Sequence, residues 1–145
     1  MKKSFRGLIA DGGQEQIRLS TNNGLTGYRI NKFEIMPARP GSSGADFESV
    51  VKVFSAEQDS IDGNVNFTDP LLLAAAAMGG SASLTIYNST LVSIFDNMVF
   101  NQDIFLTHTE KNGSEDINYY LELEQVKLSK DEATVATLKD MRASE

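Results

Sequence analysis

The stretch Asn118 to Leu128, NYYLELEQVKL, carries the clearest secondary-structure signal in the chain. Tyr119, Leu121 and Leu123 alternate with Tyr and Glu residues, so one set of side chains recurs at every second position. This period is that of a β-strand with one buried face and one face toward solvent. The segment therefore predicts a half-buried strand, and related patterns recur elsewhere in the chain.

Several other segments have the alternation or the β-branched content of strands and are separated by turn-forming residues. Gly27 to Met36 is apolar on both faces near Asn31, which predicts a β-bulge or a strand buried on both sides. Arg39 to Gly44 has the composition of an exposed loop, and Asp62-Gly63 is a hairpin signal. The predicted strands are Gln14 to Thr21, Gly27 to Met36, Glu48 to Ala56, Ala82 to Tyr87, Leu91 to Phe95, Gln102 to Glu110 and Asn118 to Leu128.

The pattern changes after Thr68. Pro70 fits the first position of a helix, and Leu71 to Met78, LLLAAAAM, has high helix propensity. Gly79-Gly80 is typical of a helix end. These signals predict one short, buried helix near residues 70–78 that packs its leucines into the core.

The end of the chain fits two structures. Ser129-Lys-Asp-Glu132 matches a capping box, in which the Ser and Glu side chains bond the backbone at the start of a helix. Ala133 to Leu138 instead contains Thr134, Val135 and Thr137, β-branched residues that are typical of a last strand. The cluster of β-branched residues favours the strand.

The spacing of these segments predicts the fold class. Seven to nine short strands, at spacings of roughly 8–15 residues and with one helix inserted, are typical of a mainly β protein. We expect an antiparallel β-sandwich or barrel with a jelly-roll-like arrangement. The 145 residues suit a single domain, 1–145, because no linker divides them. Residues 1–8 are a candidate N-terminal arm, since Phe5 and Leu8 have no obvious strand partner.

The chain lacks the residue combinations of most active sites. It has no Cys and one histidine, His108, which we expect to face solvent from a strand. Glu122 and Glu124 lie about 7 Å apart on one strand, so they do not flank a substrate cleft as hydrolytic acids do. Gln58 to Gly63 is similar to a calcium loop but has Gln58 where the first ligand would be. We therefore expect no catalytic residue, no metal ligand, no cofactor and no enzymatic activity.

Charge and hydropathy narrow the classes of partner. Lys and Arg total 13 against 20 Asp and Glu, which gives a formal net charge of −7. This sign argues against a broad nucleic-acid-binding face and against adhesion to an anionic membrane. The longest apolar run, Leu71 to Met78, is far shorter than the roughly 20 residues of a membrane span. No apolar core follows the basic start of the chain, so we expect no signal peptide.

Three parts of the sequence together resemble a known class of protein. They are Gly27 to Pro37 (GYRINKFEIMP), Ile94 to Ile104 (IFDNMVFNQDI), and Asn118 to Leu128 with Ala133 to Asp140 (ATVATLKD). They resemble the small virion structural proteins, coat or capsid-associated, of marine bacteriophages. The resemblance covers about a third of the chain and includes no catalytic or ligand motif.

The resemblance implies a non-enzymatic virion structural protein, capsid-associated as coat or head decoration, that is made in the host cytoplasm and works by homo-oligomeric assembly. Its partners would be copies of itself and other virion proteins. We expect Phe5 and Leu8 to be oligomer contacts. A tail-tube or tail-tip subunit is the alternative within the structural class. A glycan-binding β-sandwich is the alternative from another class, with Tyr28, Tyr87 and Tyr120 as its candidate aromatics.

Overall fold

The computed structural model describes residues 1–40, 46–80, 90–95, 98–111 and 115–143, with side chains described to residue 139. Within these ranges the chain forms a series of strands followed by one C-terminal helix. The elements are Lys2–Ile9 (β1), Gln14–Ile17 (β2), Thr26–Pro37 (β3), Phe47–Phe54 (β4), Leu72–Gly80 (β5), Leu91–Ile94 (β6), Ile104–Glu110 (β7), Ile117–Lys127 (β8) and Lys130–Ala143 (α1).

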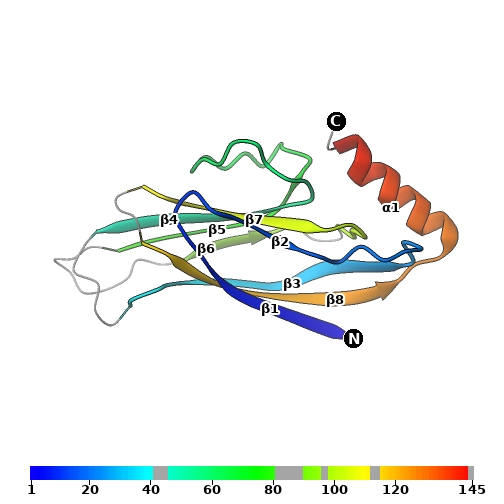
Figure 1. Ribbon diagram of the computed structural model, residues 1–145, viewed down its shortest axis with the longest axis horizontal. Coiled ribbons are helices and arrows are strands. Elements are labelled where there is room, and N and C mark those ends of the chain that lie inside the picture. The colour runs from blue at the N-terminus through cyan, green and yellow to red at the C-terminus, as the bar shows by residue number, and fades with distance from the viewer. Residues whose placement is uncertain (41–45, 81–89, 96–97, 112–114, 144–145) are drawn as a thin grey trace.

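The strands form two antiparallel sheets that stack as two layers (Figure 1). One sheet has the order β1-β8-β3 and the other has the order β2-β7-β4-β5-β6. The pairing is nested, because β1 joins β8, β2 joins β7 and β4 joins β5, as when a long double ribbon is wrapped into a jelly roll. The predicted antiparallel β-sandwich is confirmed, and the described strands do not close into a barrel.

In a complete jelly roll β3 would also pair with β6. Here these two strands belong to different sheets. β6 joins β5 in the five-stranded sheet, where Ile94 lies opposite Ala74. Further along, Phe100 exchanges two backbone hydrogen bonds with Tyr28 of β3, at 2.8 and 2.9 Å. We call residues 98–103 the crossing segment, because the chain there bonds to β3 of the three-stranded sheet before it returns to the five-stranded sheet as β7.

The hydrophobic core lies between the two layers. Leu121 and Leu123 of β8 are fully buried, and they pack in one cluster with Val51 and Val53 of β4. The alternation in Asn118 to Leu128 is therefore confirmed as a strand with one core face. The predicted irregularity near Asn31 is also confirmed, because the β3–β8 register shifts between Ile30 and Lys32.

The predicted helix near residues 70–78 is wrong. Leu72–Gly80 is β5, which pairs with β4 on one side and with β6 on the other. Helix propensity is a weak preference, and two neighbouring strands override it here while Ala74 and Ala76 fill the narrow space of the core. The Asp69 carboxylate accepts a hydrogen bond from the Leu71 backbone N–H at 2.9 Å, so the chain forms a turn at the place where the helix was predicted to begin.

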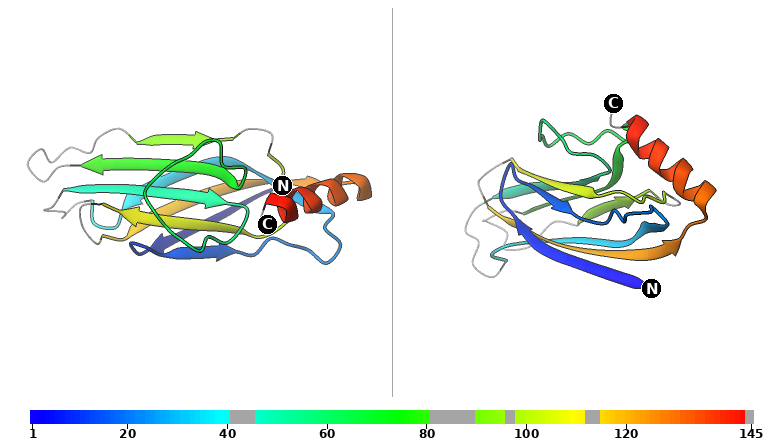
Figure 2. Two further views of the ribbon diagram at one scale, coloured as in Figure 1. Left: turned by 90° about the horizontal axis from the view of Figure 1, so that it is seen from above. Right: turned by 45° about the vertical axis from the view of Figure 1, so that its right-hand side comes forward.

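The predicted final strand over residues 133–138 is also wrong, and the capping box is confirmed. The Glu132 N–H donates to Ser129 Oγ at 3.2 Å, and the Ser129 N–H donates to Glu132 Oε1 at 3.3 Å. The helix α1 that starts there lies at one end of the sandwich (Figures 1 and 2). Its docking face consists of Ala133 and Ala136, which pack with Leu128 in a small second cluster.

Other sequence predictions have mixed outcomes. The remaining predicted strands that fall on described residues are present with shifted ends, whereas Ala82 to Tyr87 lies outside the described residues. The premise that Phe5 and Leu8 lack a strand partner is wrong, because β1 pairs with β8 from Lys2 to Ile9.

Residues 55–71, between β4 and β5, extend across the outer face of the five-stranded sheet (Figure 2).

Candidate assembly interface

The divided β3–β6 pair leaves an open seam along one side of the sandwich. β3 and β6 lie beside each other, but among the described strands no ladder joins them. A groove of about 490 Å³ is located at this seam. Its lining residues are Glu34, Ile35, Met36, Thr90, Val92, Asn118, Tyr119 and Tyr120.

Exposed apolar side chains border this groove from both sheets. Met36 of β3 is 58 % exposed and Val92 of β6 is 41 % exposed. A free strand edge beside exposed apolar groups is a surface on which another chain can add a strand or pack. We call Met36, Val92 and the groove between them the seam site.

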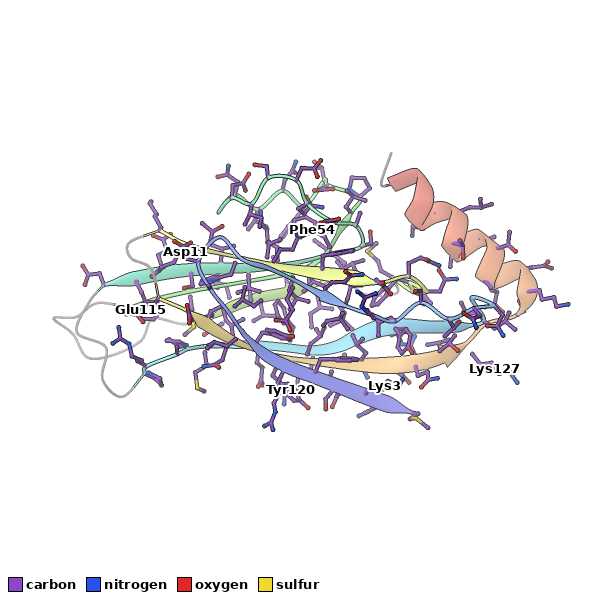
Figure 3. The ribbon with its side chains drawn as sticks, viewed as in Figure 1. Lys3, Asp11, Phe54, Glu115, Tyr120 and Lys127 are labelled. Atoms are coloured by element: carbon purple, nitrogen blue, oxygen red, sulfur yellow. The ribbon has the colours of Figure 1, made fainter. Side chains whose placement is uncertain are left out.

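The outer face of the three-stranded sheet continues from the seam site. The strand register puts Leu8, Asn118 and Met36 side by side in one row across β1, β8 and β3. Leu8 is 52 % exposed. Tyr120 lies in the next row and projects from the same outer face (Figure 3). Leu8 and Met36 therefore belong to one exposed face, near the groove.

The two residues expected as oligomer contacts have different environments. Leu8 is exposed on the outer face, so it is available for a contact with another chain. Phe5 lies opposite Leu121 in the β1–β8 register and packs against the core. A contact through Leu8 stays a prediction, whereas most of the Phe5 side chain is already used within the sandwich.

Glu122 and Glu124 lie on the outer face of β8 among basic residues. Arg29 Nε is 2.9 Å from Glu124 Oε2, and Lys2 Nζ is 3.8 Å from Glu122 Oε2. The hydrogen bond from Arg29 holds the pKa of Glu124 below its ordinary value. Both carboxylates thus belong to a ladder of exposed ion pairs, and neither lies opposite another acid across a cleft.

His108 is buried, and the prediction that it faces solvent is wrong. Its side chain is 0 % exposed because it shares the core face of β7 with Leu106. Nδ1 lies 3.0 Å from the Ile9 carbonyl oxygen, to which it donates, and Nε2 lies 3.2 Å from Ser49 Oγ. Ser49 is also buried, so this Ser–His pair connects β1, β4 and β7 out of reach of solvent.

The Gln58 to Gly63 segment forms a turn over a buried lysine. Asp62 Oδ1 accepts hydrogen bonds from the Asn64 N–H at 2.9 Å and from Lys52 Nζ at 3.1 Å. The Lys52 side chain is 8 % exposed, and this bond lowers the pKa of Asp62. The Asp62 carboxylate thus forms an ion pair with Lys52 and shapes the turn.

A tyrosine of β8 connects the two sheets on the side of the sandwich that carries β1 and β2. Tyr119 Oη donates to Glu15 Oε1 at 2.9 Å, which joins β8 to β2. Burial, together with the Glu15 carboxylate, raises the pKa of Tyr119 above its ordinary value. Gly7 makes room for this ring, because a Cβ built there would lie 2.8 Å from Tyr119 Cε1.

The aromatics considered for glycan binding are not grouped on one exposed surface. Tyr28 is buried beside Phe100 in the core, so it is not available to a glycan. Tyr120 lies on the outer face, with Lys32 Nζ 6.0 Å from the centre of its ring. Tyr87 lies outside the described residues.

Metal ligands and membrane spans were searched within the described ranges. No group of three or more His, Asp or Glu side chains there is arranged to hold a metal ion. No helix within the same ranges is both long and apolar enough to cross a membrane.

Comparisons with known proteins find a similarity of shape at low sequence identity. No protein-family model matches the sequence, and no curated protein matches it. A solved structure described as "Bacillus endospore appendages form a novel family of disulfide-linked pili" is similar to this chain, with a TM-score of 0.40 and 7% sequence identity. The match covers 89% of this chain and 88% of the other.

Proposed function

We propose that this chain is a non-enzymatic structural subunit of a virion, associated with the capsid as coat or head decoration, and that it works by assembling with copies of itself. The observation that carries the proposal is the seam site. A strand edge without a partner in the described sandwich lies there beside Met36 and Val92, which are both exposed. Burial of such groups against another copy removes apolar surface from water, which favours association.

Two of the segments that resemble phage virion proteins contribute residues to the groove of this site. Gly27 to Pro37 is nearly all of β3, and Ile94 to Ile104 runs from β6 through the crossing segment. Asn118 to Leu128 covers β8, the neighbour of β3. These three segments are neighbours in the fold, whereas the fourth, Ala133 to Asp140, lies in α1. The grouping of the three supports a shared structural role.

The proposed lack of enzymatic activity is supported by the environment of the reactive residue types. His108 and Ser49 are buried in the core, where a substrate has no access. Glu122 and Glu124 have basic partners on an open face. Neither arrangement supplies a nucleophile and base, or two opposed acids, at a cleft.

The position in the virion follows from charge. The chain has a formal net charge of −7, and packaged nucleic acid repels an acidic surface. We therefore propose a position outside the genome-lining face, with other virion proteins as neighbours and no direct contact with nucleic acid or membrane. A tail-tube or tail-tip subunit is also built by contacts between copies of one chain, and it is the second structural candidate.

Sedimentation velocity of a matched pair of variants tests the role of the seam site. Val92→Glu places a charge beside the groove, whereas Val65→Glu places one on the 55–71 segment at a residue of equal exposure, 41%. We expect Val92→Glu to shift the parent oligomer toward monomer and Val65→Glu to leave it unchanged. Equal behaviour of the two folded variants would remove the seam site from the interface.

Mass spectrometry of purified virions tests the proposed location. A virion subunit is detected there at high copy number and stays associated after nuclease and salt washes. Absence from intact particles that do contain their other coat proteins would contradict the location, even if the protein self-assembles in solution.

A further inference from the structure

Strand β3 has the longest edge of the described sandwich that is free over part of its length. It has 12 residues, and among the described strands it pairs only with β8. Near its start the other side is occupied, because Tyr28 exchanges two backbone hydrogen bonds with Phe100. A bulge follows Ile30, and Pro37 at the end of the strand has no N–H to donate. Residues 32–36 lie between these two interruptions, and we call them the β3 edge.

The backbone of the β3 edge has hydrogen-bonding groups that point away from β8. Tyr28 lies opposite Gln125 of β8. Its N–H and C=O bond Phe100, so they point away from β8. Phe33 lies opposite Leu121, four positions from Gln125 along β8. Because the direction of these groups alternates along an antiparallel pair, Phe33 also directs its N–H and C=O to the free side.

Two opposite charges flank Phe33 on the outer face of the sheet. The Lys32 and Glu34 side chains are 54% and 59% exposed, and Lys32 Nζ lies 3.3 Å from Glu34 Oε1. If two β3 edges pair in an antiparallel direction with Phe33 opposite Phe33, each Lys32 lies opposite Glu34 of the other copy. Moving the two-fold axis to residue 32 or to residue 34 instead puts two like charges opposite each other, which is unfavourable.

We propose that the β3 edge binds the β3 edge of a second copy, antiparallel about a two-fold axis at Phe33. The two three-stranded sheets then continue into each other across the contact. Phe33 of each copy donates its N–H to the Phe33 carbonyl oxygen of the other, and four charges of alternating sign surround the axis on the outer face. The inference rests on the proposed function, because it names the partner and the geometry of the seam site.

The other strand edges that the structure describes are less suited to pairing with a copy of themselves. β2 and β6 have four residues each. β1 contains Lys2, Lys3 and Arg6 and no acidic residue, so two β1 edges repel each other, and such charges are a usual protection of strand edges. Of these edges, the β3 edge alone has a lysine and a glutamate placed symmetrically about one residue. This symmetry favours a second copy over an unrelated strand, because each copy supplies the charges that the other needs.

Charge reversal in the full chain tests this pairing. Lys32→Glu and Glu34→Lys each put like charges opposite each other on both sides of the axis, so each variant should associate about tenfold more weakly than the parent. An equimolar mixture of the two variants should recover association, because one supplies two acidic residues and the other two basic residues. Sedimentation velocity measures association, and thermal melts verify that each variant is folded. A mixture that associates no better than either variant alone would overturn the proposal.

A matched control separates this pairing from a general effect of charge. Lys111 is also an exposed lysine beside a glutamate, with its Nζ 4.0 Å from Glu48 Oε2, and it lies outside the β3 edge. Lys111→Glu changes the net charge by the same amount as Lys32→Glu and should leave association unchanged. Equal weakening by the two variants would overturn the proposal.

Cysteine cross-linking tests the register, because the chain has no cysteine of its own. Residues opposite each other beside the central pair have Cα atoms about 4.5 Å apart, which a disulfide can bridge. Lys32→Cys mixed with Glu34→Cys should therefore form mainly disulfides that join one variant to the other, and Val65→Cys serves as the control for random collision. A majority of disulfides between two copies of the same variant would overturn the pairing at Phe33.

The outcome for the β3 edge can be separated from the outcome for the proposed function. If the parent assembles and Lys32→Glu assembles equally well, the β3 pairing is wrong and the proposed function stands. A parent that is monomeric at every concentration contradicts both.

Discussion

Asn101 of the crossing segment donates from Nδ2 to Thr137 Oγ1 of α1, at 2.8 Å. The same fully buried amide is 3.0 Å from the Gly24 carbonyl oxygen and 3.3 Å from that of Ala133. Gly24 has a φ of 67° and lies close to the amide, as only glycine does readily. The Asn101 side chain thus holds both the turn before β3 and helix α1 against the sandwich.

Replacement of this amide should release α1. Asn101→Leu leaves the Gly24 carbonyl oxygen without this donor and removes the bonds to Ala133 and Thr137, and we expect a loss of about 2–4 kcal/mol in the free energy of unfolding. Thr137→Val removes a single hydrogen bond and should cost about 1 kcal/mol. Urea denaturation measures both, and hydrogen exchange should show faster exchange in α1 of Asn101→Leu. Unchanged protection of α1 would contradict this role.

The buried histidine should be structural. His108→Phe keeps a ring of similar size but removes the donor to the Ile9 carbonyl and leaves the Ser49 hydroxyl with only its 3.5 Å bond to Glu110 Oε2, at a cost of about 2–5 kcal/mol. Ser49→Ala removes only the hydroxyl and should cost less. Chemical denaturation of both variants checks the order. A His108→Phe protein as stable as the parent would show that the His108 contacts contribute nothing to stability.

The space beside Tyr119 should tolerate no side chain at residue 7. Gly7→Ala pushes a methyl group into the Tyr119 ring, whose hydroxyl is held by Glu15, and we expect a loss of about 1–3 kcal/mol. Gly63→Ala is the matched control, because its Cβ would lie 3.5 Å from the nearest side-chain atom, Thr109 Cγ2. Thermal melts should separate the two variants. Equal melting temperatures would mean that the sheets shift freely at this edge.

The Lys52–Asp62 bond should make part of the stability dependent on acid. The hydrogen bond from Lys52 holds the folded-state pKa of Asp62 below its ordinary value of 3.8, so the unfolded chain binds this proton first as the pH falls. The contribution is therefore complete above that ordinary value and is lost as the pH falls through the lower folded-state pKa. Asp62→Asn should show a flatter loss of stability than the parent between about pH 5 and pH 2.

This acid effect should be modest and sensitive to salt, because the Asp62 side chain is 56% exposed. Urea denaturation at several pH values, at low and at high salt, measures it. If parent and variant lose stability in parallel throughout that range, the bond does not survive in solution.

The sequence predicts strands well where one face is buried and the other faces solvent. Asn118 to Leu128 is such a strand, and its alternation marks the correct core face. β1 is an edge strand with two Lys, one Arg and few buried residues, so its sequence carries little periodic signal. β5 lies between two strands and is buried on most of its length, so its apolar run has no period that separates strand from helix.

Other features depend on contacts that no local pattern contains. Alternation places His108 on the face opposite Thr107, but both residues are buried, because the core covers one face and the 55–71 segment the other. Thr134 favours a strand by its β-branch, yet in α1 its hydroxyl donates to the Lys130 carbonyl oxygen at 2.9 Å. Met36 and Val92 meet at the seam site only through the topology of the sheets.

Multi-angle light scattering of the parent chain, eluted from a sizing column over a wide range of loading concentrations, tests self-assembly most directly. A structural subunit should elute as a defined multiple of its 15.9 kDa mass, and the multiple should be retained or rise with concentration. A folded protein that elutes at 15.9 kDa at every concentration would contradict the account.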